Sequence, residues 1–288
     1  MKRKILFGFM IAILLAVLGF SAYQVVTIAS EYKEGSDSYQ ELNQFIVVPD
    51  ATKAAVKNGP TSMPDLQIVG HETPAPAATP EPGTVLTPVH EHRSNLAESN
   101  FTFPEVDFDA LFAINDDVVG WIYIPGTQIS YPVVQGEDND YYLERLMNGR
   151  HNGSGTIFMD YRNDPGVWDR NTILYGHHMQ NGTMFAKLVG YKKQDFYDEH
   201  PYFQFLTPEI NFQFDVVAAY VSRPDLNAWD VDFASDEAVA SWIDTALKRS
   251  LIDTGYTYTP GDQFMTLSTC TYEFNNARFV VVGVARWE

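Results

Sequence analysis

The first part of the chain is its longest apolar stretch. Residues 5–28 carry no charged side chain, and the basic residues Lys2, Arg3 and Lys4 stand directly before them. A helix of this length reaches roughly 36 Å, enough to cross the ~30 Å hydrocarbon core of a bilayer. Because basic residues favour the cytoplasmic side, the pattern predicts a signal anchor over residues 1–30, with the remainder outside the cell. A cleaved signal peptide is the alternative, although its apolar region usually spans only about 7–15 residues.

Polar and proline-rich sequence follows the apolar stretch. Residues 31–47 have the scattered apolar positions of a short juxtamembrane helix, whereas residues 48–100 hold 8 of the 16 prolines and no aromatic residue. Such a composition buries too little apolar surface to offset the entropy lost on ordering, and its prolines favour an extended, semi-stiff chain. We therefore interpret residues 31–100 as a juxtamembrane segment and a disordered linker, which would act as a spacer between anchor and domain.

Residues 101–288 have the pattern of a folded, mainly β domain. Short apolar runs alternate with Gly, Pro, Asn and Asp, as is typical of an antiparallel barrel or sandwich. Helical spacing appears at 107–115 and at 235–251, where Ser235 is suited to cap the helix N-terminus. The predicted strands lie at 119–124, 129–134, 156–159, 172–175, 212–221, 264–270 and 278–284.

Charge and cysteine content exclude several functions. The formal net charge is −18, so the surface repels phosphate backbones and we expect no nucleic-acid partner. Cys270 is the only cysteine, which excludes an internal disulfide and a multi-cysteine zinc site. It is either a small buried apolar residue or a working thiol.

Cys270 and Arg278 are predicted to be neighbours. Cys270 ends one strand-like run and Arg278 begins the next, with only residues 271–277 between them. If the two runs pair as a hairpin, the side chains lie side by side at one end of the sheet. A guanidinium there would favour the thiolate and donate to a developing oxyanion.

His177 is the histidine best placed to serve such a thiol. It follows an apolar run that ends at Gly176, and a Cys–His pair assembled by the fold is the usual arrangement for a thiol nucleophile. His178 competes with it, but side chains alternate along a strand, so we expect at most one of the two to face the site. His151 is expected to be a solvated loop residue, and His200 precedes a proline and is expected to cap a turn.

Three boxes then carry a family resemblance. Residues 175–179 (YGHHM), 266–270 (TLSTC) and 278–282 (RFVVV), in this order behind an anchor, resemble the sortases, the membrane-anchored cysteine transpeptidases of Gram-positive bacteria, and class B in particular. Further class B resemblance lies at 119–122, 131–135, 138–143 and 158–162. The resemblance implies a closed β-barrel with an N-terminal helix and a helix in the long connection before the Cys strand.

The resemblance also implies a reaction and its residues. Cys270 would attack the Thr carbonyl of a C-terminal sorting motif in an exported protein, and a peptidoglycan precursor amine would resolve the thioester without cofactor or metal. His177 would be the general acid and base, and Arg278 the oxyanion donor. Asn139 and Leu143 match substrate-contacting positions, although plain core packing is the alternative for Leu143. Ser268 lies two residues before Cys270, so on a strand it would point to the same face and could bond the motif.

Three other functions compete with this interpretation. The first is a pilin-polymerising sortase, in which the accepting amine is a lysine of another subunit. The second is a hydrolytic cysteine protease. The third is a non-catalytic wall-binding module on a stalk, which would need no reactive Cys270.

Overall fold

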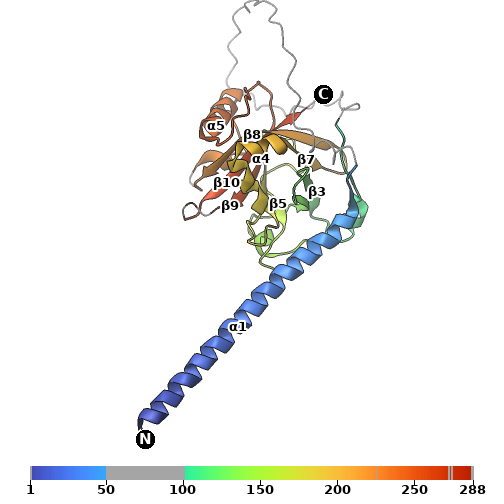
Figure 1. The fold of residues 1–288 in the computed structure, drawn as a ribbon. Coiled ribbons are helices and arrows are strands. Elements are labelled where there is room, and N and C mark those ends of the chain that lie inside the picture. The colour runs from blue at the N-terminus through green and yellow to red at the C-terminus, as the bar shows by residue number, and fades with distance from the viewer. Residues whose placement is uncertain (1, 50–100, 225, 272, 274, 287–288) are drawn as a thin grey trace, which may run out of the picture.

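A closed β-barrel forms the body of the protein (Figure 1). The computed structural model describes residues 2–49, 101–224, 226–271, 273 and 275–286. Around the barrel the strands follow the order β10-β8-β7-β3-β4-β5-β6-β9, with β10 and β9 closing the ring. The predicted mainly β fold, with one helix before the barrel and another before the Cys strand, is confirmed.

The elements have the following bounds: α1 Lys2–Leu42, η1 Asn43–Phe45, β1 Ile46–Val47, β2 Glu105–Val106, α3 Phe108–Phe112, β3 Val118–Tyr123, β4 Ser130–Val134, η3 Tyr141–Glu144, β5 Ile157–Met159, β6 Asn171–Tyr175, η4 Phe185–Lys192, α4 Gln194–Glu199, β7 Tyr202–Leu206, β8 Asn211–Ser222, η5 Asn227–Trp229, α5 Asp236–Arg249, β9 Phe264–Cys270 and β10 Arg278–Arg286.

Two apolar cores hold the last two strands in place. Side chains alternate between the faces of a strand, so Leu267 and Val281 enter the barrel interior while Phe264 and Val280 face outward. The outward set packs beneath α5, where Trp242 lies against the Phe264 ring at a centroid distance of 5.4 Å. Because β9 and β10 are packed on both faces, the residues at their ends have fixed positions.

The sequence of α5 explains where the helix begins and which face it buries. The Ser235 side chain accepts a hydrogen bond from the amide of Ala238, as the capping pattern predicted. Acidic residues occupy the first turn and basic residues the last, which complements the helix dipole. The buried residues Val239, Trp242, Ile243 and Ala246 recur at helical spacing, and they place α5 over the outer face of the barrel.

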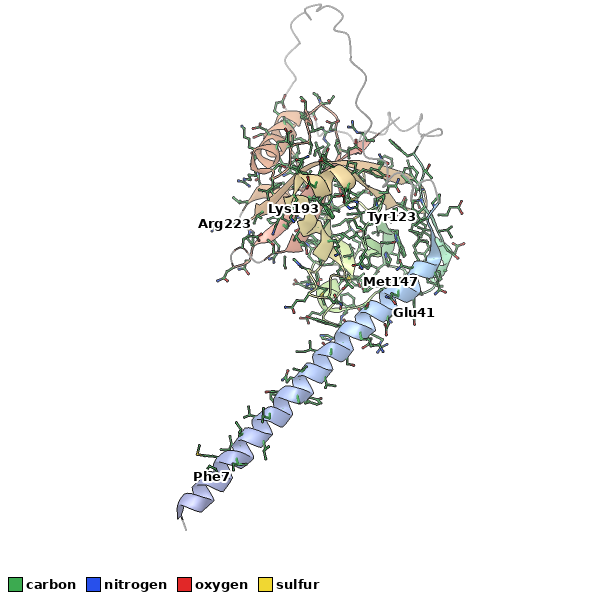
Figure 2. The ribbon with its side chains drawn as sticks, viewed as in Figure 1. Phe7, Glu41, Tyr123, Met147, Lys193 and Arg223 are labelled. Carbon is green, nitrogen blue, oxygen red and sulfur yellow. The ribbon has the colours of Figure 1, made fainter. Side chains whose placement is uncertain are left out.

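Helix α1 has a free part and a docked part. Figure 1 shows it leaving the barrel as a long rod, and Figure 2 shows Phe7 near its free end and Glu41 beside Met147 at the barrel. The free part is apolar and exposed, and the helix is long and apolar enough to cross a membrane. Near its other end, Tyr39 and Leu42 are buried in the barrel's main core.

The junction between helix and domain differs from the expected spacer. Strand β1 follows α1 after the short 3-10 helix η1 and pairs with β2, with Ile46 opposite Val106. The proline-rich segment is flanked by these two paired strands, so its two ends lie beside each other on the domain. Helix α1 contacts the barrel before this segment begins. Residues 50–100 of the predicted disordered linker (48–100) lie outside the described residues, but the length of this linker does not separate the helix from the barrel.

Docking of α1 predicts that two leucines on the same helix differ in their effect on stability. Leu42→Ala removes a side chain that is 6% exposed, so we expect a loss of about 2–3 kcal/mol and a Tm lower by roughly 5–10 °C. Leu18→Ala, at a position that is 57% exposed, is the matched control and should leave the Tm of the barrel unchanged. Thermal unfolding of the full chain in detergent, followed by tryptophan fluorescence, measures both. Equal Tm values for the two variants would contradict docking.

Candidate active site

Cys270 and Arg278 are paired across two neighbouring strands. Cys270 is the last residue of β9 and Arg278 the first of β10, and the antiparallel register places them directly opposite each other. The predicted hairpin is therefore confirmed. Cys270 is a free, partly exposed thiol, and the Arg278 guanidinium is also partly exposed and donates to the Ala277 carbonyl at 3.3 Å. The register thus brings a thiol and a cation to one end of the barrel.

The parallel pairing of β6 with β9 carries His177 to the same end. Tyr175 lies opposite Ser268, and the Gly176 amide donates to the Ser268 carbonyl at 3.1 Å. His177 is the next residue, and its Nε2 lies 2.7 Å from the Leu143 carbonyl. Because a carbonyl only accepts, Nε2 carries a proton in this arrangement. The ring of His177 is thus oriented by Leu143, which lies in the connection between β4 and β5.

The expectation that at most one of the adjacent histidines faces the site stays a prediction, but the strand alternation on which it was based does not extend to them. Strand β6 ends at Tyr175, so the alternation of a strand no longer applies at His177 and His178. The Nδ1 atom of His178 lies 3.0 Å from the main-chain carbonyl of Cys270 and donates to it. His178 therefore braces the end of β9, while His177 turns toward Leu143.

The connection from Cys270 to Arg278 is restrained by Lys192, a residue that the sequence did not single out. Lys192, the last residue of η4, forms an ion pair with Glu273 and donates to the Thr271 hydroxyl at 3.2 Å. Partial burial would raise the pKa of Glu273, but hydrogen bonds from Lys192 and Thr271 outweigh it and hold that pKa below its usual range. Glu273 thus pairs with Lys192, and this pair restrains the loop between thiol and guanidinium.

A buried carboxylate, also missed from the sequence, organises the approach to His177. Asp160 is fully buried and accepts from Arg162 at 2.8 Å, from the Tyr175 hydroxyl at 2.9 Å and from Asn139 at 3.1 Å. Burial alone would raise the pKa of Asp160, but the hydrogen bonds from Arg162 and Tyr175 lower it below its ordinary value. The segment 158–162 stood out only by resemblance, because nothing in one sequence says which carboxylate is enclosed.

The same network continues to the Cys strand. Arg162 also donates to the Trp229 carbonyl at 3.1 Å, and the Trp229 indole donates to the Ser268 hydroxyl at 3.1 Å. The 3-10 helix η5, in the long connection before β9, is thereby linked to Arg162, which follows β5, and to Ser268 on β9. The network thus contacts β9 at Ser268, two residues before Cys270, and β6 at Tyr175, two residues before His177.

The three predicted substrate-contacting residues occupy different environments. Ser268 shares the outer face of β9 but is 2% exposed and already bonded to Trp229. Asn139 braces its own loop, since its side chain bonds both Asp160 and the Tyr161 amide. Leu143 is 36% exposed rather than packed in the core, and it is the most exposed of the three, since Asn139 is only partly exposed.

The remaining histidines lie outside this constellation. His151 is exposed and 3.3 Å from Glu144. His200 follows α4, where Nδ1 donates to the Pro125 carbonyl at 2.9 Å and burial lowers its pKa. Within the described part of the chain, no group of three or more His, Cys, Asp or Glu side chains is arranged to hold a metal ion.

A closed eight-stranded barrel that presents a thiol, an arginine and a histidine at paired strand ends defines a class of protein. The Sortase domain family model matches residues 122–286, and the chain belongs to the sortase family of cysteine transpeptidases.

Relatives define the class within the family. The chain is 40% identical to Sortase B of Staphylococcus aureus over 178 residues, which is 61% of this chain and 73% of that protein. It is 34% identical to Sortase B of Listeria monocytogenes over 172 residues, 59% of this chain and 70% of that protein. The crystal structure of S. aureus Sortase B superposes with a TM-score of 0.60 at 38% identity, covering 63% of this chain and 87% of that one. The crystal structure of Clostridium perfringens Sortase B superposes with a TM-score of 0.60 at 34% sequence identity, covering 62% of this chain and 100% of that one. The similarity is to class B.

The Asp160 network predicts an acid-dependent loss of stability. Asp160→Asn leaves Arg162 without its charge partner, and since Arg162 is 41% exposed we expect a loss of about 1–3 kcal/mol at pH 7. A carboxyl group whose pKa is lowered on folding stabilises the folded state at pH values above its unfolded pKa, which is near 3.8. This stabilisation is lost as the pH falls through the lower pKa of the folded state. The difference between wild type and variant should therefore hold from about pH 7 to 5 and shrink below about pH 4.

Thermal unfolding of the full chain across this pH range measures the difference. Asp140→Asn is the matched control, because Asp140 is an exposed carboxylate near the same loop. A difference for Asp160→Asn that persists undiminished at about pH 3, or one no larger than that of the control, would contradict the assignment.

Proposed function

We propose that the chain is a membrane-anchored transpeptidase that cleaves a C-terminal sorting motif of exported proteins at a Thr carbonyl and joins the protein to a cell-wall precursor amine. The observation that carries the proposal is the pairing of Cys270 with Arg278 beside the strand that leads into His177. Two solved relatives at 39% identity and TM-score 0.59 are a S. aureus sortase B–substrate complex and sortase B complexed with triglycine. They support a peptide donor and an amine acceptor. The catalytic domain is placed at residues 101–288.

Acylation is the first half of the proposed reaction. The Cys270 thiolate forms a bond to the Thr carbonyl carbon, and the carbonyl electrons move to oxygen, where Arg278 donates to the oxyanion. The oxyanion then collapses and the C–N bond breaks. The leaving amine takes a proton from His177. Since Nε2 is held by the Leu143 carbonyl, Nδ1 is the atom assigned to this transfer.

Deacylation reverses these roles. The acceptor amine attacks the thioester carbonyl, gives its proton to Nδ1 of His177, and the S–C bond breaks to restore the Cys270 thiolate. One amide is exchanged for another, so the thioester conserves the energy of the bond and the proposal needs no ATP, metal or organic cofactor.

Recognition of the motif is proposed to centre on Leu143. Its exposed side chain belongs to the residue whose carbonyl orients His177, so a peptide in contact with it lies next to the reacting groups. Ser268 keeps a hydroxyl proton that it can donate to the motif, while its oxygen accepts from Trp229. Asn139 contributes through its remaining amide hydrogen and shapes the loop.

The proposed location is the outer face of the cell membrane. Helix α1 is long and apolar enough to span a bilayer, and its basic tip at Lys2, Arg3 and Lys4 favours a cytoplasmic N-terminus. The barrel would then lie outside, where exported proteins and wall precursors meet.

The chemistry is tested with the full chain in detergent, a panel of sorting-motif peptides, and triglycine as the added amine. Intact-protein mass spectrometry should show an acyl adduct on wild type and none on Cys270→Ala. Arg278→Lys keeps the charge but loses the guanidinium geometry, and His177→Gln removes the proton carrier. Each should slow acylation by about 10²–10³-fold while the fold is retained. Lys248→Gln, which removes a cation whose side chain is 74% exposed on α5, is the control for a lost cation.

The other functions give different outcomes. Product that forms equally well without triglycine identifies a hydrolytic protease. Product that requires the side-chain amine of a lysine from a second protein subunit identifies a polymerising sortase. Absence of any adduct, together with a Cys270 that resists alkylation in the folded chain, identifies a non-catalytic wall-binding module and overturns the proposal.

A further inference from the structure

The docked end of α1 contacts the loop that orients His177. Asn152 donates to the Glu31 carbonyl at 3.0 Å, and Arg150 forms an ion pair with Glu34. Next to these contacts the helix lies so close to the loop that a Cβ on Gly35 would be 2.5 Å from Oγ of Ser154. The helix therefore rests directly on residues 150–156, with no linker between them.

Tyr39 makes the deepest contact between the helix and this loop. Its hydroxyl donates to the Gly155 carbonyl at 2.5 Å and lies 3.0 Å from the Thr156 hydroxyl, which donates to the Arg145 carbonyl at 2.7 Å. The Tyr39 ring is 4% exposed and packs edge-on against Tyr131 at a centroid distance of 5.5 Å. One hydroxyl thus fixes the point at which the loop returns to β5.

Gly155 transmits this contact to the catalytic histidine. It adopts φ +59°, and a Cβ there would lie 2.5 Å from the Leu143 carbonyl oxygen, so this oxygen packs against the Gly155 backbone. The same oxygen accepts the hydrogen bond from Nε2 of His177. Two residues, Gly155 and Leu143, therefore separate the helix hydroxyl from the imidazole.

The opposite end of the loop is held by the barrel. The Tyr142 hydroxyl donates to Asp117 at 2.5 Å and accepts from Asn115 at 2.8 Å, both just before β3. The Thr156 amide donates to the Tyr142 carbonyl at 3.0 Å, which ties the two ends together. Leu143 is therefore held from two sides, by the barrel through Tyr142 and by α1 through Tyr39, and losing either contact would release its carbonyl.

We propose that Tyr39 is a positioning residue for His177, so that docking of the anchor helix sets the orientation of the catalytic imidazole. The inference rests on the proposed role of His177 as the proton carrier. It assigns to α1 a part in the reaction in addition to membrane attachment, since an undocked helix leaves the Leu143 carbonyl unsupported.

Tyr39→Phe in the full chain in nanodiscs is the direct test. The variant keeps the ring and its packing on Tyr131 but loses the bond to Gly155. We expect kcat for transpeptidation to fall about tenfold with KM changed by less than about twofold, because the imidazole is misplaced while the peptide surface remains. Tyr32→Phe is the matched control, since Tyr32 lies on the same helix, is half-buried, and has no hydroxyl hydrogen bond among the described contacts.

A spectroscopic readout separates positioning from simple destabilisation. In a chain labelled with ¹⁵N-histidine, the Nε2–H signal of His177, assigned by its loss in His177→Gln, should shift and exchange faster in Tyr39→Phe and remain unchanged in Tyr32→Phe. Arg150→Gln, which removes the ion pair to Glu34, should move the signal in the same direction by less, and it carries the test if Tyr39→Phe does not fold.

The outcomes are distinct. An unchanged His177 signal and unchanged kcat in Tyr39→Phe would overturn the inference, as would a loss of activity that only matches the fraction of unfolded chain. A wild-type chain that forms no acyl adduct would instead overturn the proposed function. In that case the imidazole signal still reports whether Tyr39 controls His177.

Discussion

The position of β9 between β10 and β6 is the constraint on which the proposed active site depends. Antiparallel pairing with β10 sets Cys270 opposite Arg278, and parallel pairing with β6 sets Ser268 opposite Tyr175, two residues before His177. A slip of one residue in either ladder would turn Cys270 to the other face and separate the groups. The two cores that pack on both faces of β9 resist such a slip, so the hydrophobic packing of the barrel also fixes the geometry of the proposed site.

Strand pairing places the backbone of the site, but loops orient its side chains. Asp160 and Arg162 fasten η5 to the barrel wall, Lys192 restrains the turn after Cys270, and His178 holds the Cys270 carbonyl. These contacts come from segments far apart in sequence, and most of them involve a charged or ring donor on a carbonyl or carboxylate. The bonds with an ionised partner, such as the one from Arg162 to Asp160, are stronger than neutral ones, which suits segments that hold a site in a fixed orientation.

The junction of α1 with the barrel changes how the domain would sit on a membrane. The apolar stretch ends at residue 28, and the first contact with the barrel, from Asn152 to the Glu31 carbonyl, comes three residues later, or about 4.5 Å along the helix. On the proposed anchoring, the loop that orients His177 therefore lies at the membrane surface. A flexible stalk would leave that distance undefined, whereas a docked helix fixes both distance and orientation. The proline-rich segment begins and ends on the domain, so it does not control this distance.

Local signals sufficed for much of this protein. The charge-free run predicted the long helix, the Ser235 cap and the acidic first turn predicted α5, and alternating apolar runs predicted the strands that carry Cys270 and Arg278. These features depend on residues close together in the chain, which is why one sequence determines them. The tertiary structure alone decided that Asp160 is enclosed, that Lys192 pairs with Glu273, that His178 donates to the Cys270 carbonyl, and that Tyr39 touches the loop beside His177. Each of these joins residues from separate elements. The distances between such residues depend on how the whole barrel closes, and no pattern of neighbouring residues in the chain indicates them.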